Sequence, residues 1–231
     1  MIHWQQLSPD VALLKYDLRR FGIDFGRVVT LMRLRDGRLV LHSTAPFAPE
    51  EVAAIRRFGE PAWLVEATGM HDTFARTAQL AFPGIPYLTP APLAGLAATA
   101  LNPPPRDWAG EIDLIRIEGL RRIDEYAFFH RASRTLVLAD LLFHFPAEMH
   151  GWPRFFVKTI MRLPRLVGIS FLFRSMIRDR ECFGHSVQKI LAWDFRQIVV
   201  AHREPIVGDA KSVFVRALRE RGFARDRRLA D

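Results

Sequence analysis

The feature that most constrains this chain is a short helix framed by two apolar, strand-like runs. Pro49 opens the segment EEVAAIRRFG, which has acids in its first turn and arginines in its last, and Gly59 follows as a stop. The run RLVLHS (38–43) precedes this helix, and AWLVEA (62–67) follows it. A continuous apolar run such as AWLVEA is typical of a strand buried on both faces. The sequence therefore predicts a β-α-β unit here.

Further strands and a second helix extend this unit in the first half of the chain. An Asp36-Gly37 turn joins two apolar runs into a hairpin, and together with VALLKYD (11–17) they form an antiparallel meander. After the strand at 62–67, a helix with Asp72 or Thr73 as its cap leads to the strand IPYL (85–88). A second β-α-β unit thus follows the first.

The second half of the chain predicts a second sheet. Three strands follow one another closely, and Ala132-Ser133 turns the last two into a hairpin. Residues 146–193 are helical in character, with breaks near Pro153, Pro164 and Gly184, and a buried strand and a closing helix complete the chain. The expected strands are IDLIRIE (112–118), YAFFHRA (126–132), TLVLAD (135–140) and RQIVVAH (196–202), and the closing helix is GDAKSVFVRALRERG (208–222).

Composition limits the class of protein and the cellular compartment that the chain can belong to. Its 231 residues are 49% hydrophobic and 25% charged, which is ordinary for a globular protein. We expect one domain over 1–231, with its core at about 10–222, a helical insertion at 146–193 and a flexible tail at 225–231. The single Cys182 permits no internal disulfide, which, with an N-terminus that lacks a secretory pattern, predicts a cytoplasmic location. We interpret Cys182 as an inert thiol rather than a nucleophile.

The net charge of +8 comes almost wholly from arginine. Basic proteins attract nucleic acid and anionic membranes, but here no single tract gathers the charge, which argues against nucleic-acid binding. The most apolar tract, Phe155 to Ile177, carries four basic residues and is therefore not a membrane span. As a helix, 154–178 would separate a basic face from an apolar one. Packing on the protein's own core, a homodimer interface and peripheral membrane contact all explain that pattern.

Two separated segments resemble the metallo-β-lactamase-fold hydrolases. SRTLVLADLLF (133–143) looks like the strand of that superfamily that ends in an aspartate bridging two metals, a position held by Asp140. IVVAHREPIVGDAKSVFVRAL (198–218) is similar to the late strand, the final metal-binding histidine, a Pro-Ile pair and the closing helix, and His202 holds the histidine position. The resemblance implies an α/β (α+β) four-layer αβ/βα sandwich, with two mixed sheets flanked by helices.

Much of the superfamily's metal-binding motif is missing. Where the family has His-x-His-x-Asp-His, this chain reads Ala67 to Asp72 as ATGMHD, so two histidines are lost and the Asp-His pair is inverted as His71-Asp72. The turn EGLRRIDE (118–125) offers no histidine where the family places another. The sequence resembles an uncharacterised branch of the superfamily with a degenerate metal-binding motif.

Imidazoles and carboxylates that converge from different strand ends can hold a divalent cation. The resemblance implies His71, Asp140 and His202 as metal ligands, with Asp72 as a candidate fourth. Weaker candidates for the surrounding pocket are His42, Ser43, Glu125 and His144. Each of these residues also has a structural interpretation, such as capping a loop or helix, and Glu125 is either a general base or a solvated strand end.

Two functions from different classes follow. One is a metal-dependent hydrolase-like protein with a reduced, mononuclear site for zinc, manganese or iron and an unknown substrate. The other is a non-catalytic binding or interaction protein that keeps the scaffold and binds no metal, since a fold alone does not imply activity.

Overall fold

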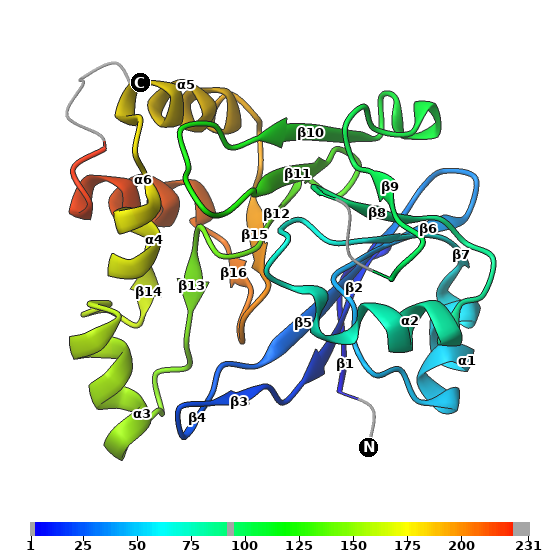
Figure 1. Cartoon of the computed structure of the whole chain (residues 1–231), viewed down its shortest axis with the longest axis horizontal. Helices are drawn as coiled ribbons and strands as arrows, with labels where there is room; N and C mark the ends of the chain where they lie inside the picture. The colour runs from blue at the N-terminus through cyan, green and yellow to red at the C-terminus, as the bar shows by residue number, and fades with distance from the viewer. Residues whose placement is uncertain (1–2, 92–94, 224–231) are drawn as a thin grey trace.

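The computed structural model describes residues 3–91 and 95–223. A mixed sheet of seven strands occupies the N-terminal half, in the order β1-β2-β5-β6-β7-β8-β9 (Figure 1). Neighbours from β1 to β6 are antiparallel, and those from β6 to β9 are parallel. The bounds are β1 Trp4–Ser8, β2 Val11–Tyr16, β5 Arg27–Arg33, β6 Arg38–His42, β7 Glu60–Val65, β8 Tyr87–Thr89 and β9 Thr99–Ala100.

A second mixed sheet has the order β10-β11-β12-β15-β16, in which only β12 and β15 are parallel. Two short strand pairs, β3 with β4 and β13 with β14, lie outside both sheets. The bounds are β10 Ile112–Arg116, β11 Tyr126–His130, β12 Thr135–Leu138, β15 Gln197–Val200, β16 Ile206–Val207, β3 Arg19–Arg20, β4 Ile23–Asp24, β13 Phe143–His144 and β14 Val167–Gly168.

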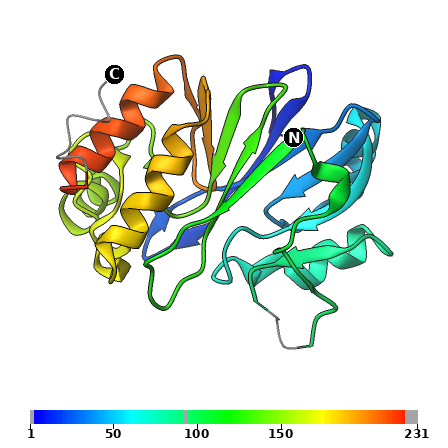
Figure 2. The same cartoon turned by 90° about the horizontal axis from the view of Figure 1, so that it is seen from above.

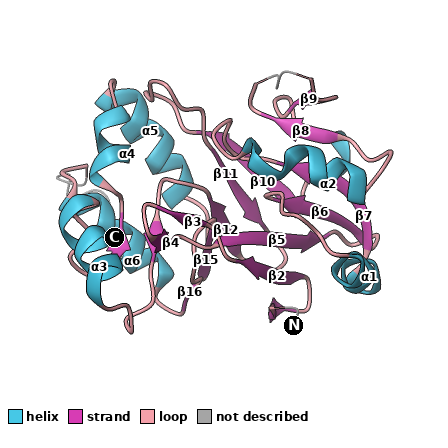
Figure 3. Cartoon of the chain, turned by 60° about the horizontal axis from the view of Figure 1, so that its bottom comes forward, coloured by secondary structure: helices cyan, strands magenta, loops and turns pink. Residues whose placement is uncertain are grey.

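Six α-helices and three tighter or wider helical turns complete the described chain (Figure 3). The α-helices are α1 Pro49–Phe58, α2 Ala75–Ala81, α3 Gly151–Phe155, α4 Phe171–Met176, α5 Arg180–Leu191 and α6 Ala210–Glu220. The turns are the 3-10 helices η1 Asp72–Phe74 and η2 Arg106–Trp108 and the π-helical turn η3 Phe156–Ile160.

The two sheets pack face to face, with helices on both outer faces (Figure 2). Alternate residues of each strand explain this: Val11 and Leu13 of β2 join Phe128 and Val199 of the other sheet in the central core, while Ala12 and Leu14 pack toward α1 and α2. Buried residues of α4, α5 and α6 cover the outer face of the second sheet. This arrangement confirms the predicted four-layer sandwich of two mixed sheets flanked by helices.

Gly59 ends α1, as predicted, but for a reason other than a left-handed backbone. Its φ of 175° is extended, which any residue adopts. A Cβ at this position would lie 2.6 Å from the carbonyl oxygen of Gly37. A glycine is therefore required because the helix end and the β5–β6 turn approach each other closely.

Three local predictions are wrong. Neither Asp72 nor Thr73 caps α2 through its side chain; they lie in η1, and α2 begins at Ala75. Pro153 lies within the first turn of α3, where its missing N–H costs no hydrogen bond, and Gly184 lies inside α5, whose packing tolerates it. The break at Pro164 is confirmed, because the chain there leaves η3 and enters β14.

The apolar tract at 155–177 divides into η3, the strand β14 and α4. No helix among the described residues has both the length and the apolar character needed to cross a bilayer. Strand β1 was not predicted, since WQQLS is largely polar and gains its place by pairing with β2. The tail predicted to be flexible, 225–231, lies outside the described residues.

Candidate metal centre

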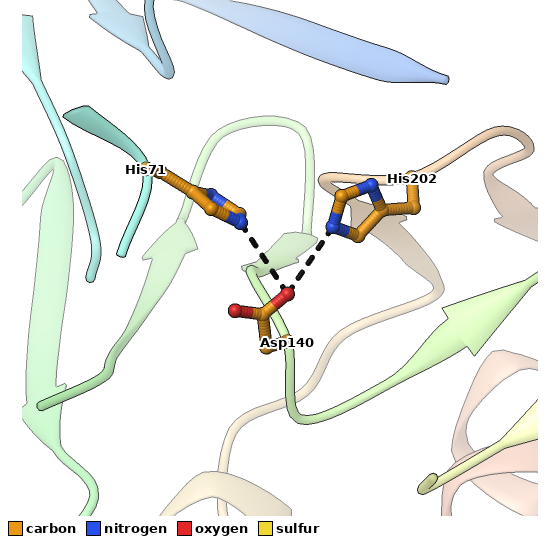
Figure 4. Close-up of side chains that lie close together, drawn as sticks. All are labelled: His71, Asp140 and His202. Atoms are coloured by element: carbon orange, nitrogen blue, oxygen red, sulfur yellow. Dashed lines mark hydrogen bonds and ion pairs between the residues drawn. The ribbon is translucent and has the colours of Figure 1, made fainter. Parts of the chain in front are cut away.

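Three side chains predicted as metal ligands meet at one edge of the sandwich. Oδ1 of Asp140 lies 3.3 Å from Nε2 of His71 and 3.2 Å from Nε2 of His202 (Figure 4). One donor atom from each residue lies within 4.8 Å of the other two. Both imidazoles are buried, while the Asp140 side chain is 16% exposed. We call these three residues the triad.

Strand register explains why residues so far apart in sequence converge. Strands β12 and β15 are parallel, with Leu138 opposite Val200, so Asp140 and His202 each follow two residues beyond the same register position. His71 follows β7 in the other sheet, and the bridge between Thr68 and Glu125 joins its loop to the second sheet. Carboxyl ends of strands from both sheets therefore meet at the triad.

The His202 ring is held from both sides. Its Nδ1 lies 3.0 Å from the carbonyl oxygen of Gly26, an arrangement in which Nδ1 donates the hydrogen bond and Nε2 faces Asp140. Phe143 stacks on the ring, with centroids 5.2 Å apart and planes 6° apart, and Phe25 meets it edge-on. A backbone carbonyl that fixes the second imidazole nitrogen is a usual support for a metal-ligating histidine.

A buried ion pair supports the loop that carries His71. Arg27 Nη2 lies 2.7 Å from Glu66 Oε1, and both side chains are almost wholly buried. The same Nη2 donates to the carbonyl oxygen of His71 at 3.1 Å, and Arg27 Nε donates to the carbonyl oxygen of Thr44 at 3.0 Å. The pair thus ties strand β5 to the His71 loop.

Glu125 supports the loop that carries Asp140. Its carboxylate accepts the backbone N–H groups of Ala139, Asp140 and Leu141 at 3.0–3.1 Å. Burial, together with the negative charge of Asp140, raises the pKa of Glu125 to about 8. Glu125 is fully buried and does not line the cavity described below, so it positions Asp140 rather than standing at a solvated strand end.

The electrostatics of the triad favour an ionised aspartate. Burial alone would raise the pKa of Asp140, but attraction to His71 and the hydrogen bonds and charge of His202 and His71 outweigh it and hold that pKa well below its usual range. An anionic oxygen between two imidazole nitrogens is the donor set that a divalent cation needs.

The other sequence candidates are not members of the triad. Asp72 is exposed at the start of η1 and is not brought into the cluster. His42 and Ser43 are buried at the end of β6, where His42 meets Phe128 edge-on with centroids 4.9 Å apart. His144 is half-buried, and its Nδ1 lies 3.2 Å from the carbonyl oxygens of Glu204 and Pro205.

Two residues near the triad were not singled out from the sequence. Glu66 is an acid inside the otherwise apolar run AWLVEA, and that anomaly is a usable signal for a buried, paired carboxylate. Arg27 gave no such signal, because an arginine at the start of a strand is ordinary.

The exposed thiol of Cys182 lies at the start of α5. Its hydrogen bond with Asp179 raises the pKa of the thiol, in keeping with an inert thiol.

A cavity of about 360 Å³ opens beside the triad. All three triad residues line it. In the described part of the chain, none of the weaker candidates His42, Ser43, Glu125 and His144 does. The triad therefore faces a space large enough for a small ligand.

No family profile and no curated protein matches this sequence. Solved structures do match. A metallo-β-lactamase from Erythrobacter litoralis with β-mercaptoethanol in its active site is 16% identical, with a TM-score of 0.64 over 95% of this chain and 96% of that one. The mono-zinc form of a metallo-β-lactamase from the same organism is 15% identical, with a TM-score of 0.61 over 95% and 96%.

A metallo-β-lactamase from Pontibacter korlensis is 11% identical, with a TM-score of 0.57 over 92% of this chain and 96% of that one. Identities this low carry no residue roles from those proteins to this one. The match nevertheless spans nearly the whole length of both chains. Together with the observed sheet order, it shows that this chain has the metallo-β-lactamase fold.

Proposed function

We propose that the triad binds one divalent metal ion and that the protein is a metal-dependent hydrolase. The observation that carries this proposal is the position of Asp140 Oδ1, 3.2 and 3.3 Å from two imidazole nitrogens beside an open cavity. In a tetrahedral zinc site with bonds of about 2.0–2.1 Å, neighbouring donor atoms are about 3.3 Å apart. The two distances from Asp140 to the imidazole nitrogens match this spacing, and all three donor atoms lie within 4.8 Å of one another.

The donor chemistry also suits a metal. Two imidazoles and one carboxylate form the set found in catalytic zinc sites and in non-haem iron sites, and manganese accepts the same kinds of ligand. One ion is proposed rather than two because Ala67 and Gly69 stand where the resemblance implies the His-x-His pair. When bound, a divalent metal polarises a carbonyl or phosphoryl group and lowers the pKa of a water molecule toward about 7.

The chain's own residues have distinct parts in this proposal. His71, Asp140 and His202 hold the ion. The carbonyl oxygen of Gly26 keeps Nε2 of His202 directed at Asp140. Glu125 holds the backbone of the Asp140 loop, and the phenylalanines around His202 keep bulk water away from that imidazole.

Metal analysis of untagged protein, purified without chelator, tests the proposal. We expect about one ion per chain in the wild type and none in His202→Ala. His185→Ala is the matched control, because His185 is exposed on α5 and should leave the metal content unchanged. A loaded protein would then be assayed on esters, phosphodiesters and lactams.

A second candidate, a non-catalytic binding protein, is favoured by one observation. The side chains of the triad can hold one another, since Asp140 Oδ1 lies 3.2 Å from Nε2 of His202 and 3.3 Å from Nε2 of His71, distances that suit direct contacts between these side chains. If wild-type protein contains no metal, and added zinc, manganese or iron leaves its thermal stability unchanged, the hydrolase proposal is wrong and this candidate stands.

A further inference from the structure

We infer that the ligand of this site carries an aliphatic chain, which lies in the cavity while its polar, hydrolysable group meets the triad. The inference deepens the proposed function and rests on it for the hydrolytic step only. Its basis is the chemistry of the cavity wall and of the cavity mouth.

The cavity wall is almost entirely apolar. Beyond the triad, the lining includes Phe25, Phe143, Phe156, Met161, Phe173 and Met176, and among the described residues the only other polar side chains in it are those of Arg20 and Ser170. Ser170 is already engaged, because its Oγ accepts the N–H of Phe173 as the N-cap of α4. A sugar, nucleotide or peptide would lose its hydrogen bonds to water here and find few in return, whereas an aliphatic chain loses none.

The apolar surface continues to the outside at the cavity mouth. Four lining residues remain largely exposed: Phe21 (75%), Leu172 (64%), Met70 (55%) and Ile160 (53%). They come from the β3–β4 turn, α4, the loop after β7 and η3. In Figure 1, β3, β4, α3 and α4 lie on one side of the molecule. Apolar groups gathered around a cavity mouth, rather than scattered singly, mark a binding site.

Specific contacts fix the exposed residues at the cavity mouth. Phe21 has a φ of 54°, a left-handed conformation that is costly for an aromatic residue. Its carbonyl oxygen accepts Nε1–H of Trp152 at 3.0 Å, and its ring stacks on Phe156 with centroids 6.1 Å apart. These contacts fix the turn over the cavity. Arg20, beside it, is exposed and also lines the cavity.

Binding of a homologous series of alcohols tests the inference. Hexanol, octanol and decanol carry no charge, so their affinity for the cavity does not require a metal, and calorimetry would be run on both metal-loaded and chelator-treated protein. We expect the affinity to rise by about fourfold for each added methylene, as full burial of a methylene predicts.

Two variants with a matched control assign the binding to this cavity. Leu172→Glu and Ile160→Glu each place a carboxylate at the mouth, and we expect each to weaken decanol binding at least about tenfold, the cost of desolvating a charge beside the chain. Leu80→Glu makes the same change at a still more exposed position (77%) on α2, outside the cavity lining, and should bind decanol as the wild type does. Circular dichroism would confirm that all three variants are folded.

The outcomes separate this inference from the proposed function. If the affinity for the alcohols does not depend on chain length, or if decanol binds both mouth variants as tightly as the wild type, the inference of an aliphatic ligand is wrong. This holds even if the protein binds metal. Chain-length dependence in a protein that binds no metal supports the aliphatic ligand and rejects the hydrolase. Decanol affinity that falls as protein concentration rises would show a second copy covering the mouth, and would overturn the inference as well.

Discussion

Nε2 of His202 and Oδ1 of Asp140 lie 3.2 Å apart at the ends of two parallel, neighbouring strands. Asp140→Asn preserves the shape of this contact but removes the anionic oxygen. Because a divalent ion needs that charge, we expect metal affinity to fall by more than the roughly 10- to 100-fold typical of changes outside the ligand shell. Zinc titration followed by thermal unfolding measures the loss.

Asp72→Asn is the control for that experiment. Asp72 follows His71 directly, yet it is exposed and lies outside the triad. The variant should bind zinc as the wild type does. Equal loss of zinc in both variants would mean that Asp72 is a ligand and that the His71 loop adopts a different arrangement when loaded.

We expect Glu125 to contribute both to the stability of the protein and to its affinity for a metal ion. In Glu125→Gln, the amide oxygen can still accept two of the three backbone N–H groups, but the amide nitrogen, a donor, replaces the oxygen that accepts the third. We expect a loss of about 1–3 kcal/mol in the free energy of unfolding, the usual cost of a buried group left unpaired. Metal affinity should fall about 10- to 100-fold, as for other supporting residues.

The readouts for Glu125→Gln are urea unfolding and zinc titration. Glu118→Gln provides the comparison, since Glu118 lies on the same turn but its side chain is 54% exposed. A Glu125 variant as stable as this control would show that the three N–H contacts contribute little.

The ion pair of Arg27 and Glu66 predicts strong coupling between two substitutions. Arg27→Met leaves a buried carboxylate without its cation and should cost about 3–5 kcal/mol, and Glu66→Leu should be similar. The double variant should be more stable than either single variant, because no charge is then left buried alone. A cycle of urea unfolding experiments measures the coupling. Additive losses would contradict a direct interaction of the two side chains.

The fold was largely predictable from sequence because its core strands are continuous apolar runs. Asp140 and His202 were predictable too, since each ends such a strand and keeps flanks that resemble a known superfamily. The convergence of His71 with them depends on how the two sheets face each other. The superfamily resemblance predicts that arrangement, whereas the hydrophobic periodicity of the single elements does not. Strand β1 was missed because WQQLS owes its strand conformation to pairing with β2.

The cavity was beyond prediction for a different reason. Phe21, Phe143, Met161 and Leu172 lie in separate segments of the chain, and no pattern within one segment shows that they share a wall. As one helix, the basic, apolar tract at 154–178 would separate a basic face from an apolar one. The structure divides it, and side chains of η3 and α4 line the cavity instead of forming a single stripe.

His42 predicts how stability depends on pH. Burial, with the charges of Arg27 and His71, lowers the pKa of His42 to about 3. The unfolded chain, with a histidine pKa of about 6.5, therefore binds a proton more readily than the folded one, so this contribution to stability is complete above about pH 6.5 and is lost as the pH falls toward 3. Between pH 7.5 and 5.5 the wild type should lose about 1.4 kcal/mol more than His42→Gln, which is similar in size and does not titrate. Urea unfolding at both pH values measures the difference. Burial also lowers the pKa of His130, so His130 adds a pH dependence of the same sign, but this contribution is present in both proteins and cancels. Parallel pH dependence in the two proteins would show that His42 accepts its proton in the folded state, and so that the end of β6 is open to water.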